Sequence, residues 1–190
     1  MRRLAIACLV LLPAIALAAN QNDLEKLMAL KKAQSIHLDL SNADLRNYPF
    51  IPGKIDLQGA NISHSNLSGV DLSKMNLANA DLSYTDLSNA KLNEVNLAGA
   101  NLEHANLAGA QMQQSNLAHT NLSFAVLTGA NLQQSLLTNA DLTCANLNEA
   151  NLSKSTFAQA NISGASFINT VTDNVIGYES VVEMKLRCQG

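Results

Sequence analysis

Aromatic and charged residues are both scarce in this chain. It has no tryptophan, an aromatic share of 4% and a charged share of 14% over 190 residues. Hydrophobic residues still reach 47%, so the apolar share comes from small and aliphatic side chains, chiefly Leu and Ala. We therefore expect neither a core centred on aromatic rings nor a disordered chain. The length suits a single domain.

The first residues are typical of a secretory signal peptide. Arg2 and Arg3 form a basic start, residues 4–12 an apolar stretch, and Ala16-Leu17-Ala18 a small-x-small cleavage site. This pattern predicts export to the periplasm or out of the cell.

We place the signal at residues 1–18 and the mature start at about Ala19. The apolar stretch is shorter than the roughly 20 residues that span a bilayer, so no membrane span is expected after cleavage. A retained anchor and a lipid-modified Cys8 are the alternatives.

Cysteine is rare as well, with three in the chain. Cys144 and Cys188 follow the signal and would enter a compartment where disulfides form. A single bridge between them and two free thiols remain open.

Basic residues are too few and too scattered for a nucleic-acid surface. Without the signal, ten Lys and Arg face fifteen Asp and Glu, a net charge of about −5. No basic stripe is present, so we expect no binding to nucleic acid.

What the chain has in abundance is leucine at a fixed spacing. From Leu57 to Phe167 an apolar residue recurs every fifth position for 23 consecutive units. A small residue, usually Ala, stands two positions earlier, and Asn or Asp usually stands one position earlier. The central positions are Leu57, Ile62, Leu67, Leu72, Leu77, Leu82, Leu87, Leu92, Leu97, Leu102, Leu107, Met112, Leu117, Leu122, Leu127, Leu132, Leu137, Leu142, Leu147, Leu152, Phe157, Ile162 and Phe167.

A period of five fits neither regular element. On an α-helix five residues advance about 500°, so these side chains would spiral around the helix. On a straight strand an odd spacing places successive side chains on opposite faces. The chain must therefore turn in every unit, with the Ala and the central residue pointing inward.

Residues suited to turns stand two positions after the central residue in alternate units. Gly and Asn tolerate the positive φ of a type II turn. These positions are Gly59, Gly69, Asn79, Asn89, Gly99, Gly109, Gly129, Asn139 and Asn169.

The runs Ala80-Asp81-Leu82-Ser83, Ala100-Asn101-Leu102 and Ala130-Asn131-Leu132 resemble the pentapeptide-repeat family. The resemblance implies an all-β fold, a right-handed quadrilateral β-helix with four pentapeptides per coil. On that basis the repeats form about 5.75 coils and a rod about 28 Å long, with coils spaced like paired strands.

We divide the mature chain into three parts. Residues 19–54 hold an N-terminal cap helix and irregular first repeats, residues 55–169 the solenoid, and residues 170–190 a C-terminal cap or tail. Solenoids need such caps because their end coils are exposed.

The N-terminal cap helix is expected over residues 22–32, with Asn22 as N-cap and Glu25 three residues later. Tyr48 to Pro52 should distort the first repeats, and Gly53-Lys54 should shift their register.

At the C-terminus a group of apolar residues could close the bore as a strand or a short helix. This group consists of Val171, Val175, Ile176, Tyr178, Val181, Val182, Met184 and Leu186.

One external column supports a functional hypothesis. With four pentapeptides per coil, His64, Tyr84, His104 and Phe124 align, followed by Cys144. Such a stripe could contact a protein or a glycan. Stacking that stabilises the solenoid without any ligand is the simpler interpretation.

We expect no enzyme, cofactor or metal site. His64 and His104 would lie two coils apart, too far to share an ion, and no catalytic motif is present.

Ser115, Ser135 and Ser155 should form an inward column bonded to backbone. Two further positions, Val126 and Leu136, replace the usual Asn or Asp and could expose apolar surface at a contact point.

The leading functional hypothesis is a non-enzymatic structural or protein-binding module of the bacterial envelope, with an unknown partner. The family resemblance implies an alternative, since acidic dimeric members resemble DNA and inhibit or protect DNA gyrase. A secreted effector scaffold is a further alternative. The oligomeric state is not readable from the sequence.

Overall fold

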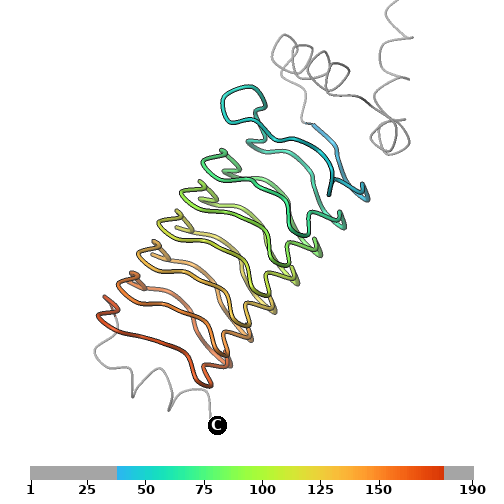
Figure 1. Ribbon diagram of the computed structural model, residues 1–190. Helices are drawn as coiled ribbons and strands as arrows, with labels where there is room; N and C mark the ends of the chain where they lie inside the picture. Colours follow the sequence, from blue (N-terminus) through green and yellow to red (C-terminus); the bar gives the residue numbers. More distant parts are fainter. Residues whose placement is uncertain (1–37, 178–190) are drawn as a thin grey trace, which may run out of the picture.

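The computed structural model describes residues 38–177, which climb as a stack of similar coils along one axis (Figure 1). Within this range the structure has no helix, and from residue 60 onward each pentapeptide contributes one isolated bridge residue instead of a longer strand. The bridges run from Asp39 to Ile176 and are all parallel. The described chain is therefore a parallel β-helix.

Four pentapeptides make one coil. Asn61 pairs with Asp81, Asp81 with Asn101, and Asn101 with Asn121, so each bridge residue meets its counterpart four pentapeptides later. This confirms the coil size that the family resemblance implied. The bridges define four faces of the tube. Face 1 carries Asn76, Asn96, Asn116, Leu136, Thr156 and Ile176; face 2 carries Asp39, Asn61, Asp81, Asn101, Asn121, Asp141 and Asn161; face 3 carries Asp44, Asn66, Asp86, Asn106, Val126, Asn146 and Ser166; face 4 carries Asp71, Lys91, Gln111, Asn131, Asn151 and Val171.

The first coil is longer than the others. Asp39 pairs with Asn61 and Asp44 with Asn66, so this coil holds two extra residues beyond four pentapeptides. The extra residues fall between Asp44 and Asn61, where residues 52–54 form a turn and Gly53 has a φ of 75°. The first coil has a wide loop (Figure 1). The predicted register shift at Gly53-Lys54 is confirmed.

The bore is filled as the period of five predicts. Central residues such as Leu97 and Leu117 are fully buried, and so are Ala105 and Ala110 two positions before their central residues. Burial of this kind contributes roughly 1.5–3 kcal/mol per leucine.

The buried serines bond to backbone, as expected. Ser115 Oγ donates to the Met112 carbonyl at 2.7 Å, and Ser135 and Ser155 donate to the carbonyls of Leu132 and Leu152. The serine column is thus structural.

Every unit turns with a positive φ two residues after its central residue, from Gly59 to Asn174. The Ala60 N–H donates to the Leu57 carbonyl at 3.0 Å and closes the first of these turns. The prediction for Gly and Asn is confirmed. The structure extends the same conformation to bulky residues, which the sequence did not predict.

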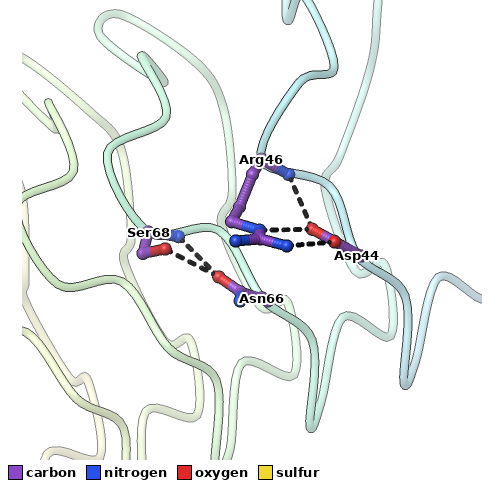
Figure 2. Close-up of polar contacts among 4 residues, drawn as sticks. All are labelled: Asp44, Arg46, Asn66 and Ser68. Carbon is purple, nitrogen blue, oxygen red and sulfur yellow. Dashed lines mark hydrogen bonds and ion pairs between the residues drawn. The ribbon is translucent and has the colours of Figure 1, made fainter.

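The Asn or Asp before each central residue fastens its own turn. Figure 2 shows the motif in two successive coils on face 3. Asn66 Oδ1 accepts hydrogen bonds from the Ser68 N–H at 3.1 Å and hydroxyl at 2.8 Å. One coil earlier, Asp44 accepts from the Arg46 backbone N–H at 3.3 Å, from Nε at 2.9 Å and from Nη2 at 2.7 Å. These side chains hold the corner in place.

Acid titration should reveal the Asp44–Arg46 pair. Hydrogen bonds from the Arg46 side chain and backbone lower the pKa of Asp44 from 3.8 to about 2. Since the folded-state pKa lies below the unfolded one, the stabilisation is complete above the unfolded pKa and is lost as the pH falls through the folded value. An NMR titration of the Asp44 carboxyl should have its midpoint at about 2, and Arg46→Ala should move it back toward 3.8. A midpoint that Arg46→Ala leaves unchanged would contradict this.

Both predicted caps extend beyond the described range. The helix over residues 22–32 and the residues from Tyr178 onward lie outside it. Of the expected C-terminal group, Val171 and Ile176 continue the coil as bridge residues, and Val175 packs against the core. No helix within residues 38–177 is long and apolar enough to cross a membrane.

Candidate interaction surface

Residues 38–177 contain no cluster of metal-ligating side chains. The rings of His64 and His104 stack on opposite sides of Tyr84, so the two imidazoles cannot share an ion. Two lysine–carboxylate ion pairs, Lys74–Glu94 at 3.6 Å and Lys91–Asp71 at 3.9 Å, lie in the pentapeptides of face 4 and are exposed. Neither resembles a buried catalytic pair.

The predicted column of rings is confirmed as a continuous stack, which we call the aromatic ladder: His64, Tyr84, His104 and Phe124. Successive ring centroids are 4.9, 4.8 and 4.9 Å apart, with interplanar angles of 5°, 17° and 11°. The ladder follows the corner between faces 2 and 3. Tyr84 and Phe124 remain 52% and 47% exposed.

The ladder is costly for the backbone. Its four residues have φ between 57° and 59°, a conformation that costs an L-residue roughly 1–2 kcal/mol. The three stacked pairs contribute about 0.5–1.5 kcal/mol each. Stacking therefore offsets the strain at best, and it does not by itself explain why rings occupy this corner.

Two of the other corners mostly avoid that cost, whereas the corner after face 4, which carries Lys, Glu and Gln, has the same positive φ. The corner after face 1 has Gly59, Asn79 and Gly99, and the corner after face 3 has Gly69 and Asn89. Gly and Asn adopt positive φ with little strain. The aromatic corner thus presents side chains that the turn geometry does not need.

Between its two ends the ladder exposes ring edges, not ring faces. Tyr84 and His104 each have neighbours stacked on both sides. A sugar ring stacks on the flat face of an aromatic ring, and those faces are covered. The geometry suits a protein contact better than a glycan contact.

Charge is sorted by face. From residue 57 to 177 the three lysines, Lys74, Lys91 and Lys154, all belong to pentapeptides of face 4, where Asp71, Glu94 and Asp173 balance them. Face 1 carries no charge in this range. The other five carboxylates belong to pentapeptides of faces 2 and 3: Asp81, Asp86 and Glu103 lie beside the ladder, and Asp141 and Glu149 lie in the coil beyond Phe124. This sorting was not predicted from the sequence, although an alignment of the chain by coils of four pentapeptides contains it.

The remaining predicted residues are separated. Cys144 is exposed beyond Phe124, in line with Gly164 of the next coil. Its predicted bridge partner, Cys188, lies outside the described residues. The expected exposure of Val126 and Leu136 is confirmed, at 38% and 48%, but they stand on different faces and form no common patch.

These features define a class of protein: a four-sided β-helical repeat rod with an exposed aromatic corner. The family model for pentapeptide repeats matches residues 55–93, 96–134 and 135–171. The chain belongs to the pentapeptide-repeat family, and membership implies the predicted right-handed coil.

Solved pentapeptide-repeat structures are similar to this chain. Rfr23 from the cyanobacterium Cyanothece is 37% identical over 50% of this chain, with a TM-score of 0.43. This chain covers 63% of the Rfr23 chain. A thylakoid-lumen protein from Arabidopsis thaliana is 26% identical, with a TM-score of 0.50 over 55% of this chain and 69% of its own.

A more distant structure is QnrB1, a plasmid-mediated fluoroquinolone resistance protein. It is 18% identical, with a TM-score of 0.36 over 78% of this chain and 86% of its own. A similarity this weak says nothing about the function of this chain. No curated protein matches this sequence.

Proposed function

We propose that this chain is a non-enzymatic protein-binding module exported to the bacterial envelope, with the aromatic ladder as its contact surface. The observation that carries the proposal is the ladder itself, a continuous stack of four rings at one corner in which Tyr84 and Phe124 remain about half exposed. Aromatic side chains are the residues that most often dominate protein interfaces.

The proposed location depends on the signal-like start. The basic residues Arg2 and Arg3, the apolar stretch and the Ala16-Leu17-Ala18 site support export. Cell fractionation with N-terminal sequencing should find the protein in the envelope or the medium, starting at about Ala19. A cytoplasmic protein that starts at Met1 would contradict the location and leave the contact surface to be tested separately.

Charge density does not favour DNA mimicry. Duplex DNA carries about one charge per 1.7 Å, or about 16 over a 28 Å rod. Faces 2 and 3 together carry the five unbalanced carboxylates of residues 57–177. The negative charges are therefore far too sparse to imitate a DNA duplex.

A double variant tests the contact surface. Tyr84→Asn with Phe124→Asn removes two rings and relieves two strained turns, so the free energy of unfolding should change by less than about 1 kcal/mol. Capture of partner proteins from envelope extract should fall at least about tenfold. Urea unfolding and quantitative pull-down measure the two effects.

The matched control uses the opposite corner. Gln114→Asn with Gln134→Asn alters two residues at equivalent turn positions, where φ is 58° and 60°. This variant should keep both stability and capture. Equal capture by the parent, the ladder variant and the control would remove the ladder as the contact surface.

A further inference from the structure

The carboxylates beside the ladder are held in place but not neutralised. Asp81 Oδ1 accepts the Ser83 N–H at 3.0 Å and the Asn101 amide at 3.2 Å. Asp86 Oδ1 accepts the Ser88 N–H at 3.0 Å and the Asn106 amide at 3.1 Å. Neutral donors fix the position of a carboxylate and leave its charge in place.

The lysines that could balance these carboxylates lie on another face. Within residues 57–177 every lysine belongs to face 4, and the lysine–carboxylate pairs are formed there. On faces 2 and 3 of these coils, the one contact of a carboxylate with a titratable base is Glu103 Oε1 with His104 Nε2, at 3.9 Å. The aromatic corner thus has a negative field on both sides.

We propose that the aromatic ladder and its flanking carboxylates receive a partner segment that carries lysine or arginine among apolar side chains. This inference rests on the proposed function and names the chemistry of the partner. The ring edges provide apolar contact area at the centre of the surface. Asp81, Asp86 and Glu103 provide the charge complementarity that selects and orients a cationic segment.

The field also excludes other partners. An acidic segment would meet like charge on both sides of the ladder, and such juxtaposition opposes binding. The ring faces of Tyr84 and His104 are covered, so at the centre of the ladder the attraction of a cation comes from the carboxylates. Binding should therefore weaken as salt screens the charges.

Two labelled peptides serve as probes with the full chain: acetyl-(Arg-Ala)5-amide and acetyl-(Glu-Ala)5-amide. Fluorescence anisotropy at low salt should detect binding of the arginine peptide alone. The triple variant Asp81→Asn, Asp86→Asn and Glu103→Gln should weaken that binding at least about tenfold. Thermal unfolding of the variant verifies that it remains folded.

A second triple variant controls for net charge. Asp71→Asn, Glu94→Gln and Asp173→Asn remove the same charge from the pentapeptides of face 4 and should change peptide affinity less than about twofold. Equal losses in both variants would show attraction to overall charge only and overturn the inference. Equal binding of the glutamate peptide would overturn it as well.

The two proposals fail in different ways. If extract capture needs Tyr84 and Phe124 but survives loss of the three carboxylates, the basic partner is wrong and the contact surface stands. If capture is unchanged by the loss of Tyr84 and Phe124, the proposed contact surface itself is wrong.

Discussion

Leu137→Ala is expected to lower the free energy of unfolding by about 2–5 kcal/mol. The Leu137 side chain is fully buried in the bore, between central residues of the coils before and after it. Truncation removes apolar contacts and leaves a cavity that the closed tube cannot easily collapse around. Urea unfolding followed by circular dichroism measures the loss.

The neighbouring leucine is the control. Leu136 is 48% exposed on face 1, and its backbone N–H donates to the Ser115 carbonyl at 3.0 Å, a bond that alanine keeps. Leu136→Ala should change stability by no more than about 0.5 kcal/mol. Similar losses for both leucines would contradict the assignment of inside and outside.

Ala105→Leu should clearly lower the stability of the solenoid. Ala105 is fully buried beside the central residues of its coil, and extra methylenes in a closely packed core cost about 1–3 kcal/mol or more. The larger side chain must push apart coils that parallel bridges join on every face. A lower midpoint in thermal and urea unfolding is the expected result.

Ala108→Leu provides the comparison three residues later. Ala108 lies at the first turn position, where its side chain is only half-buried. This enlargement should cost less than about 0.5 kcal/mol. If Ala105→Leu is tolerated equally well, the bore is looser than the structure indicates.

Much of the fold was predictable because each pentapeptide repeats the same pattern of two inward residues followed by a turn. An Ala and a Leu two positions apart must point inward, and the pair that follows must turn, so the inside residues could be named one by one. The burial of Leu57, Leu97 and Ala100 confirms this. The coil size came from the family resemblance, because no single pentapeptide encodes how many units close a turn.

The candidate site was only half predictable. The alignment of the aromatic ladder followed from the coil of four pentapeptides, and its stacking is confirmed. The positive φ of Tyr84 and Phe124 was not predicted, since aromatic residues have no preference for it. Backbone bonds to the next coil, such as the Tyr84 N–H to the Glu103 carbonyl at 2.9 Å, hold that conformation.

The sequence by itself determined which side chains enter the bore and which remain outside. The same two positions of every five-residue unit point inward, and the other three remain outside. Only the tertiary structure decided which outside residues become neighbours. Hydrogen bonds between coils place each residue beside the one four pentapeptides away, after a first coil that is slightly longer. That spacing stacks the four rings and leaves Asp81, Asp86 and Glu103 beside them, since residues distant along the chain meet only when the coil closes.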